Sequence, residues 1–329
     1  MLQVRNISKT YPGENLGAVK GVSFNVDKGE IVSIIGQSGC GKTTLLQILA
    51  GLMKPDNGTV SINGEFLLNP EEQLIAGHSD IKMVFQNYDL KPNMTVEENI
   101  GYMLLEYEST YKAEKTNQLL SLCGLEDFRK RQPKELSGGQ QQRLSLARAL
   151  ADEPDLLLMD EPFSNIDPIS KRNLLLEIER ITKELDVAIV FVSHDTQDAL
   201  MISDRVGFMK DGHLIEMNTP QALYHAPNNL SAAKFLGVLN QFDFQELFSL
   251  GIKDLPPNKS IAVIRAEALA LNTEGDHKVI IKECKFLGPN YLVRSLSQSG
   301  TELHHMSKEN IEIGATRFIN IAMNDLIYF

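Results

Sequence analysis

The sequence has few cysteines and no long apolar run, and each shortage excludes a class of protein. Its three cysteines, Cys40, Cys123 and Cys284, are far apart and form no CxxC pair. This pattern argues against a disulfide framework and is typical of a reducing compartment. The longest apolar stretches, such as residues 187–192, are too short to cross a bilayer. We therefore expect any membrane contact to be made through a partner.

An excess of basic residues is also missing. The chain has 32 lysines and arginines against 43 aspartates and glutamates, which gives a formal charge of −11. This balance argues against general electrostatic binding to nucleic acid, so we expect no nucleic-acid partner. The first ten residues lack the apolar core of a secretion signal, and we expect the chain to remain in the cytoplasm.

The chain has the composition of a folded protein with more than one domain. It contains 329 residues, of which 43% are hydrophobic and 23% are charged. At roughly 100 to 200 residues per domain, this length predicts about two domains. The composition excludes wholesale disorder and a fibrous structure.

Strand-like and helix-like segments alternate over the first two thirds of the chain. A long helical stretch at residues 95–150 interrupts this alternation, and an α/β alternation with parallel strand order is expected to resume after it. From residue 261 onward the runs are short and β-prone. The predicted organisation is an α/β domain over residues 1–236 with a helical subdomain at about 95–150, a linker at 237–257, and a small all-β domain at 258–329. The predicted core strands are residues 2–7, 19–26, 30–35, 81–85, 156–159, 187–192, 205–209 and 213–216.

A glycine-rich loop follows the third predicted strand and opens a helix. Residues 36–43 read GQSGCGKT and match the phosphate-loop pattern G-x-x-x-x-G-K-[ST] in its proper strand–loop–helix context. Glycines let backbone N–H groups turn toward a polyphosphate, Lys42 reaches its oxygens, and Thr43 offers a hydroxyl to Mg²⁺. The pattern predicts a P-loop NTPase core. Its expected nucleotide contacts are Gly36, Gln37, Ser38, Gly39, Cys40, Gly41, Lys42, Thr43 and Thr44.

Two carboxylates follow an apolar strand further along. Residues 156–161 read LLLMDE, and such a strand delivers its last side chains to the sheet edge where open α/β sheets bind ligands. We expect Asp160 to orient the metal and its waters. Glu161 is the expected base that polarises the attacking water.

A third motif indicates which kind of P-loop NTPase the sequence resembles. Residues 136–140 read LSGGQ and stand directly before the helical segment QQRLSLARAL. With this motif, residues 1–235 resemble the nucleotide-binding subunit of ATP-binding cassette transporters. The resemblance implies ATP as the nucleotide and a head-to-tail homodimer that holds two ATP molecules at its interface. Ser137, Gly138, Gly139 and Gln140 would then contact the nucleotide of the other subunit.

The resemblance also assigns roles to single residues. It implies that Tyr11 stacks on adenine, although a loop tyrosine alone is as readily structural. Asp167 would lie in the loop that crosses the dimer interface. His194 would contact the γ-phosphate and hold Glu161. Gln86 would touch Mg²⁺ or the attacking water and sense the membrane partner.

The sequence from residue 194 onward resembles the branch that serves bacterial importers of sugars, polyamines, ferric iron, thiamine and anions. Members of that branch carry a C-terminal oligomer-binding-type β domain, for which a regulatory or purely structural role stays open. The resemblance implies membrane permease subunits that contact residues 86–100, with Tyr88, Leu90 and Met94 as candidate apolar contacts. It also implies an indirect extracytoplasmic solute-binding protein and a peripheral position on the inner membrane. An exporter subunit and a soluble, non-transport ATPase remain as alternatives.

Two further residue types invite prediction. Cys40 stands at a helix N-terminus, which lowers a thiol pKa, so we expect alkylating reagents to inhibit the protein and ATP to protect it. His304 and His305 have no further ligands at a metal-site spacing, which favours a solvated turn over a metal site.

Overall fold

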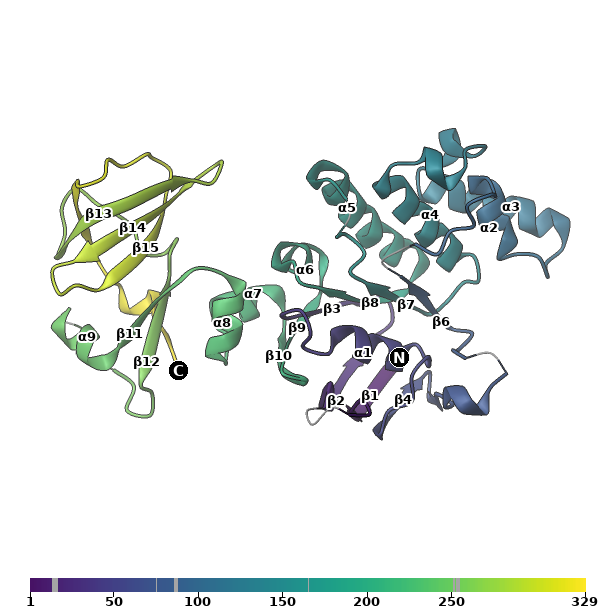
Figure 1. Ribbon diagram of the computed structural model, residues 1–329, viewed down its shortest axis with the longest axis horizontal. Helices are drawn as coiled ribbons and strands as arrows, with labels where there is room; N and C mark the ends of the chain where they lie inside the picture. The colour runs from purple at the N-terminus through teal and green to yellow at the C-terminus, as the bar shows by residue number, and fades with distance from the viewer. Residues whose placement is uncertain (14–16, 75, 86–87, 165, 251, 253–254) are drawn as a thin grey trace. The chain divides into compact units, whose positions relative to one another are not determined.

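The computed structural model describes residues 1–329 except 14–16, 75, 86–87, 165, 251 and 253–254 (Figure 1). The chain forms two compact units, Met1–Pro220 and Gln221–Phe329, called here the first unit and the second unit. No helix among the described residues is both long and apolar enough to cross a membrane.

The first unit begins with a four-stranded antiparallel sheet. Its strand order is β2-β1-β4-β5, and Asn63 and Gly64, both with positive φ, form the tight turn between β4 and β5. One face of β1 is buried and the other is exposed, as its alternating sequence predicts. The strands are β1 (Leu2–Lys9), β2 (Val19–Val26), β4 (Asn57–Ile62) and β5 (Glu65–Phe66).

A six-stranded sheet in the order β10-β9-β3-β8-β7-β6 forms the centre of this unit. Its strands are β3 (Ile31–Ile35), β6 (Ile81–Val84), β7 (Leu156–Asp160), β8 (Ala188–Ser193), β9 (Arg205–Lys210) and β10 (His213–Asn218). All neighbours are parallel except β9 and β10, which are antiparallel. The expectation of parallel order is therefore wrong for β10. The two residues between these strands, Asp211 and Gly212, both have positive φ and form a hairpin turn, which leaves no room for a crossover.

Helices cover both faces of the central sheet. Helix α1 (Lys42–Leu49) lies between the two sheets, where its leucines share one hydrophobic core with β1, β3 and β8. On the other face lie α5 (Pro168–Leu185) and α6 (Thr196–Ile202) (Figure 1). This arrangement confirms the predicted α/β core.

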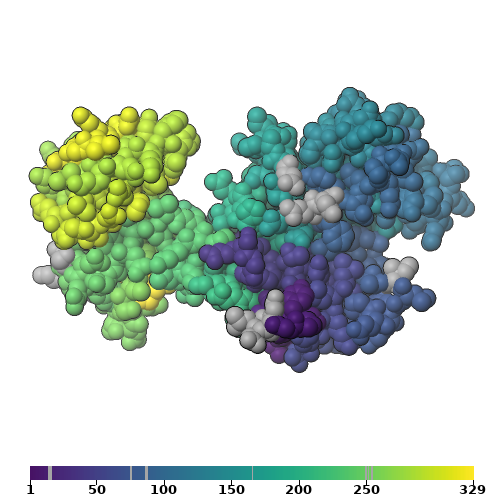
Figure 2. Space-filling view, viewed as in Figure 1, coloured from purple at the N-terminus to yellow at the C-terminus, as the bar shows by residue number. Residues whose placement is uncertain are grey.

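The predicted helical segment contains α2 (Val96–Tyr102), α3 (Ser109–Leu122) and α4 (Gly138–Leu150). Thr95 caps α2 with a capping box that includes Glu98, and Ser137 caps α4 in the same way with Gln140. In the space-filling view, the N-terminal strands (purple) and α2 and α3 (blue) lie on opposite sides of the first unit (Figure 2).

The second unit is mainly antiparallel β structure preceded by two short helices. Its sheets have the strand orders β11-β12-β17 and β15-β14-β13-β16, and Phe242, Leu269 and Val279 lie in the core that they share. The elements are α7 (Pro220–His225), α8 (Leu230–Leu236), β11 (Leu239–Asp243), α9 (Phe244–Ser249), β12 (Ile261–Arg265), β13 (His277–Phe286), β14 (Tyr291–Ser297), β15 (Glu302–Ser307), β16 (Thr316–Ile319) and β17 (Ile327–Tyr328).

The predicted linker at residues 237–257 is wrong. Strand β11 pairs with β12 along its whole length, and Phe242 and Leu247 are buried in the core of the second unit. The boundary also lies earlier than predicted, because Arg265 of β12 stacks its guanidinium 3.6 Å from the ring centre of Tyr224 in α7. The same guanidinium donates to the Tyr224 carbonyl, with its Nε at 3.0 Å. These contacts join α7 to the β structure.

The solvated turn predicted at His304 and His305 is also wrong, because both residues lie on β15. His305 is fully buried, and its ring nitrogens are hydrogen-bonded to Ser295 Oγ at 2.7 Å and to the Leu269 carbonyl at 2.9 Å. Burial lowers the pKa of His305 to about 4. This histidine is neutral and has a partner on each nitrogen.

Candidate active site

The phosphate loop connects β3 to α1 and requires glycine at two positions. A Cβ at Gly41 would lie 2.0 Å from the carbonyl oxygen of Ala18, and one at Gly36 would lie 2.2 Å from that of Met209. Gly41 also has φ 103°, a conformation that side-chain-bearing residues rarely adopt. The loop therefore lies directly against the backbone of neighbouring segments, which holds its shape.

Lys42 lies at the centre of this loop. Only 5% of the residue is exposed, and its Nζ donates hydrogen bonds to the carbonyls of Gly36 at 2.8 Å and Gln37 at 3.1 Å. A buried ammonium held by carbonyl dipoles is poised to exchange them for the stronger charge of a phosphate. The structure thus places this predicted residue where an anion would be bound.

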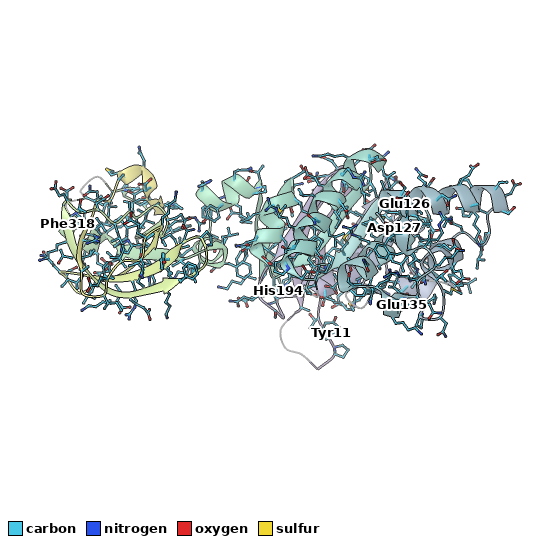
Figure 3. The ribbon with its side chains drawn as sticks, turned by 90° about the horizontal axis from the view of Figure 1, so that it is seen from above. Tyr11, Glu126, Asp127, Glu135, His194 and Phe318 are labelled. Atoms are coloured by element: carbon cyan, nitrogen blue, oxygen red, sulfur yellow. The ribbon has the colours of Figure 1, made fainter. Side chains whose placement is uncertain are left out.

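A cavity of about 470 Å³ opens over the loop, within the size range of small-ligand sites. The loop contributes Ser38, Gly39, Gly41, Lys42, Thr43 and Thr44 to its lining, and Glu161 reaches it from the end of β7. Tyr11 lines it from the segment after β1, where its hydroxyl is hydrogen-bonded to Thr44 Oγ1 at 3.1 Å. Figure 3 shows Tyr11 and His194 along the same edge of the first unit. The cavity fits a nucleotide with its phosphates on the loop.

Sequence reasoning missed five residues of this cavity. Gly17 and Ala18 belong to the segment before β2, and the other three are Lys20, Asp211 and Gly212. These three arrive from β2 and from the β9–β10 hairpin, and Gly212 receives the Lys20 N–H on its carbonyl at 2.8 Å. The Asp-Gly pair signals a turn in the sequence, but nothing local shows that this turn packs beside the phosphate loop. Lys20 adds a second cationic side chain to the site.

Thr43 and Asp160 meet as predicted for a metal site. Thr43 Oγ1 donates to Asp160 Oδ1 at 3.1 Å, so a hydroxyl and a carboxylate oxygen lie side by side. Burial raises the pKa of Asp160, and the nearby Glu161 carboxylate adds to this effect, whereas the bond from Thr43 opposes it. A divalent cation would stabilise the charged form of such a carboxylate, and Mg²⁺ prefers oxygen ligands. Gln86, the third predicted ligand, lies outside the described residues.

Glu161 and His194 form a hydrogen-bonded pair across two neighbouring strands. His194 Nδ1 lies 2.9 Å from Glu161 Oε2, and the Glu161 N–H donates to the carbonyl of Val192 at 3.1 Å. Glu161 has φ 45°, a left-handed conformation that a non-glycine residue rarely adopts and that is common at functional sites. The bend directs the Glu161 side chain into the cavity while the histidine holds it.

Cys40 does not behave as predicted. Only 7% of the residue is exposed, and burial raises the pKa of its thiol, although Lys42 acts in the opposite direction. Backbone N–H groups of Cys40 and Lys42, at the start of the helix, also lower the pKa, but burial outweighs them. Burial and the raised pKa therefore disfavour the reactive thiolate that the sequence predicts.

The LSGGQ segment lies at the start of α4. Ser137 N donates to Gln140 Oε1 at 2.9 Å, and Gln140 N donates to Ser137 Oγ at 3.4 Å. Among the described residues that line the cavity over the phosphate loop, none comes from residues 136–140. Asp167 caps α5 by accepting from Ile169 N at 3.2 Å and Ser170 N at 3.0 Å. These predicted residues are ordered, but they do not complete the site of their own chain.

Comparison with known families agrees with this geometry. Residues 19–164 match the family model described as ABC transporter. The chain is 34% identical to an Fe(3+) ions import ATP-binding protein of Escherichia coli, over 96% of this chain and 91% of the relative. It is 36% identical to a spermidine/putrescine import ATP-binding protein of Fusobacterium nucleatum, over 85% of this chain and 70% of the relative.

Solved structures agree as well. The chain matches the ATP-binding cassette MJ0796 in a dimeric post-hydrolysis state bound to ADP and Pi, with a TM-score of 0.59 and 31% identity. That match covers 67% of this chain and 99% of the cassette. It also matches cbiO1 of Clostridium perfringens, part of the transporter complex cbiONQ, with a TM-score of 0.64 and 26% identity over 68% of this chain and 89% of that one.

Proposed function

The chain belongs to the ATP-binding cassette (ABC) transporter family, and we propose that it is the ATP-hydrolysing subunit of an importer. The observation that carries this proposal is that Glu161, which lines the cavity over the phosphate loop, is hydrogen-bonded to His194. An ATP-binding scaffold without turnover would need the loop but not this pair. Relatives named for import of polyamines and of ferric ions favour import over export.

The residues divide the work of hydrolysis. Lys42 and the loop N–H groups stabilise the negative charge on the phosphates. Thr43 and Asp160 would hold Mg²⁺, which neutralises phosphate charge and orients the leaving group when it is bound. Glu161 accepts a proton from the attacking water, and the hydrogen bond from His194 keeps its carboxylate in place.

The site becomes complete only in a homodimer. The LSGGQ residues and Asp167 lie on α4 and α5, away from the lining of their own cavity. In a head-to-tail dimer, Ser137 and Gly139 of one copy would cap the ATP held by the other. ATP binding closes such a dimer, and loss of the γ-phosphate removes the bridge that holds it closed.

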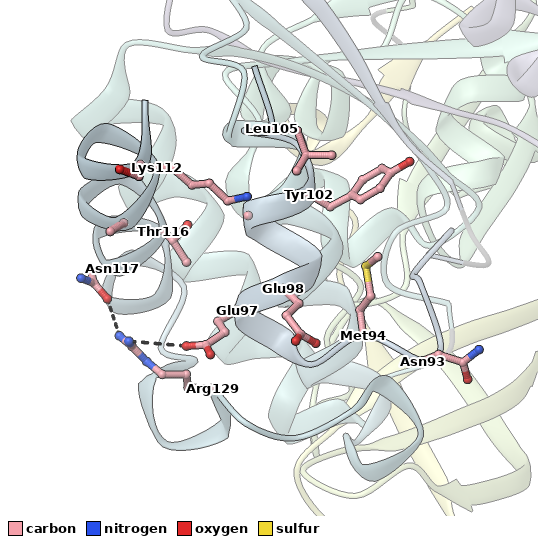
Figure 4. Close-up of a pocket in the computed structure, with 13 residues that line it drawn as sticks. Asn93, Met94, Glu97, Glu98, Tyr102, Leu105, Lys112, Thr116, Asn117 and Arg129 are labelled. Atoms are coloured by element: carbon pink, nitrogen blue, oxygen red, sulfur yellow. Dashed lines mark hydrogen bonds and ion pairs between the residues drawn. The ribbon is translucent and has the colours of Figure 1, made fainter. Parts of the chain in front are cut away.

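A groove in the helical segment is the proposed contact for the membrane permease. It has a volume of about 690 Å³ and lies between α2 and α3 (Figure 4). Tyr102 and Leu105 line it with 42% and 62% of their surface exposed, and Met94, one of the predicted contacts, lines it too. An amphipathic helix fits such a groove, with apolar residues facing Met94 and Leu105. Leu90 does not line this groove.

Tyr88, another predicted contact, lines a smaller neighbouring cavity with Phe85. Its backbone is tied to α4, because Ser145 Oγ donates to the Tyr88 carbonyl at 3.0 Å and Arg148 donates to the carbonyl of Asp89. A permease that pushes on this segment would therefore move α4 and the LSGGQ loop. We propose that the protein works on the cytoplasmic side of the inner membrane, with an extracytoplasmic solute-binding protein selecting a polyamine, ferric iron or a similar solute.

The test of the activity is the Glu161→Gln variant in the protein reconstituted with its permease. We expect Mg²⁺-dependent turnover to fall by at least about 100-fold, since a general base contributes that much, while ATP is still bound. Light scattering should then show an ATP-bound dimer that persists. Glu184→Gln, an exposed carboxylate on α5, is the control and should keep wild-type turnover. A Glu161→Gln protein that hydrolyses ATP normally would refute the proposed base.

The partner is tested by purifying the complex from its own cells in mild detergent. We expect a multi-spanning membrane protein to co-purify with the wild type and to be lost from Leu105→Glu. Leu176→Glu, at a comparably exposed leucine of α5, should keep it. Recovery of the wild type without a membrane protein would favour the soluble, non-transport class of ATPase.

A further inference from the structure

A cluster of one cation and two anions joins the first turns of α5 and α6. Lys171 Nζ lies 2.7 Å from Asp195 Oδ2 and 2.9 Å from Asp198 Oδ1. The side chain of Asp198 is only 4% exposed, and that of Lys171 is 22% exposed. Because Asp198 is buried, loss of its cationic partner would leave an uncompensated charge in the interior.

Each end of the cluster is attached to a functional residue. Asp195 directly follows His194, its N–H donates to Ser193 Oγ at 2.9 Å, and its carboxylate caps α6 by accepting from Gln197 N at 2.9 Å. Lys171 lies one turn after Asp167, and its N–H donates to the Asp167 carbonyl at 2.9 Å. The cluster therefore connects the strand end that carries His194 to the loop that carries Asp167.

The same turn of α5 lies against the LSGGQ segment. A Cβ at Gly139 would be 3.4 Å from Ser170 Cβ and 3.6 Å from Ile166 Cγ2. The start of α5 thus contacts the LSGGQ segment, which would bind the ATP of the partner subunit. In the same turn, Lys171 is paired with Asp195, which follows the His194 that serves the ATP of its own subunit. The inference that follows rests on the proposed function as a dimeric ATPase.

We propose that Lys171 is a positioning residue that fixes His194, and through it Glu161, relative to the interface loop of Asp167. Lys171 touches neither the nucleotide site nor the reacting atoms. When the loop of Asp167 contacts the partner subunit, its position fixes Lys171, and the ion pair with Lys171 fixes Asp195. His194, the residue before Asp195, is then held in place. ATP is then hydrolysed efficiently only while the interface is closed.

The charges around the cluster support a fixed geometry. Burial alone would lower the pKa of Lys171, but its hydrogen bonds to Asp195 and Asp198 outweigh burial and raise it. Burial raises the pKa of Asp198, and Lys171 opposes that rise. Removal of Lys171 would leave the Asp198 carboxylate buried without its partner, so it would turn toward solvent and disturb the start of α6.

The experiment compares Lys171→Met with Lys183→Met in the permease-bound protein. Lys183 lies on the same helix and forms an exposed ion pair with Glu179, so it controls for the loss of one charge from α5. We expect Lys171→Met to lower kcat about tenfold with the KM for ATP changed less than about threefold, and Lys171→Arg to restore most of kcat. Lys183→Met should behave as the wild type.

A double-mutant cycle separates positioning from general damage. If Lys171 acts through His194, Lys171→Met should add less than about twofold to the loss caused by His194→Ala. Wild-type kcat in Lys171→Met, or fully multiplicative losses in the double variant, would overturn the inference. Should Lys171→Met fail to fold, Asp195→Asn replaces it, because it removes one acceptor of Lys171 at the more exposed carboxylate of the cluster. This variant should likewise lower kcat with little change in KM and add less than about twofold to the loss caused by His194→Ala. Absence of turnover in the wild-type complex would instead refute the proposed function.

Discussion

The two units use the same residue type in opposite ways. In the first unit, the His194 side chain is 55% exposed and holds Glu161 at the edge of a parallel sheet. In the second unit, His305 is fully buried in an antiparallel sheet with both ring nitrogens hydrogen-bonded. The first is available to a ligand and the second is not.

The difference comes from the position of each histidine relative to its strand: His194 follows the end of β8, whereas His305 lies within β15. Strand β8 ends at the carboxyl edge of the central sheet, where side chains are delivered to a cavity. Strand β15 pairs with β14, which places His305 opposite Val293 inside the core. His194 therefore serves chemistry, whereas His305 stabilises structure.

Substitution of each histidine by alanine should separate these roles. We expect His194→Ala to lower turnover by about 100-fold or more, through loss of the group that holds the base, with unfolding changed by less than about 0.5 kcal/mol. His305→Ala should leave turnover per folded molecule unchanged and cost the second unit roughly 3 kcal/mol. The measurements are ATPase rates and amide hydrogen exchange of β14 and β15. Equal effects of both variants on turnover would remove the contrast.

Lowering the pH should destabilise the second unit through His305, which further separates the role of this histidine from that of His194. Because the pKa of His305 is lowered from 6.5 to about 4, the unfolded chain binds more protons than the folded one between these values. The shifted pKa of His305 contributes about 3 kcal/mol to the free energy of unfolding. This contribution is complete above pH 6.5 and is lost as the pH falls toward 4.

Hydrogen exchange of residues 291–307 between pH 7 and 4, corrected for intrinsic rates, measures that loss. We expect His305→Gln to abolish this pH dependence and His304→Gln, at the partly exposed neighbour on β15, to keep it. A wild-type second unit whose stability does not change between pH 6.5 and 4.5 would contradict the assignment.

The smallest expected effect concerns the cysteines. Cys40 and Cys123 are buried, and burial raises the pKa of Cys123 to about 12, whereas Cys284 in the second unit is partly exposed. Iodoacetamide should modify Cys284 at least about tenfold faster than the other two in the folded protein. Peptide mass spectrometry over time measures the three rates, and Cys284→Ser provides the control. Modification of Cys40 as fast as Cys284 would restore the original expectation of a reactive thiol.

Motifs whose chemistry and context lie close together in the sequence were predictable. The phosphate loop, the LLLMDE strand and the fold class follow from local patterns, and the structure brings Thr43 to Asp160 and His194 to Glu161. Such motifs carry their own geometry, because glycine, lysine and a buried strand permit few alternatives.

Features that depend on distant segments were not predictable. Lys20 and Asp211 reach the cavity only because β2 and the β9–β10 hairpin pack beside the loop. Strand β11 has little alternation of its own and is stabilised by pairing with β12. Cys40 is buried by segments that pack over the phosphate loop, and its position at a helix end does not contain that information.

The close approach of Gly36 to Met209 and of Gly41 to Ala18 has a consequence for the substitutions that this loop tolerates. A larger residue at either position requires the backbone of β9 or the segment before β2 to withdraw by an ångström or more. Three stretches separated by up to about 190 positions are therefore coupled by direct contact. A single substitution at Gly36 or Gly41 is therefore destabilising unless the strands around the loop shift as well.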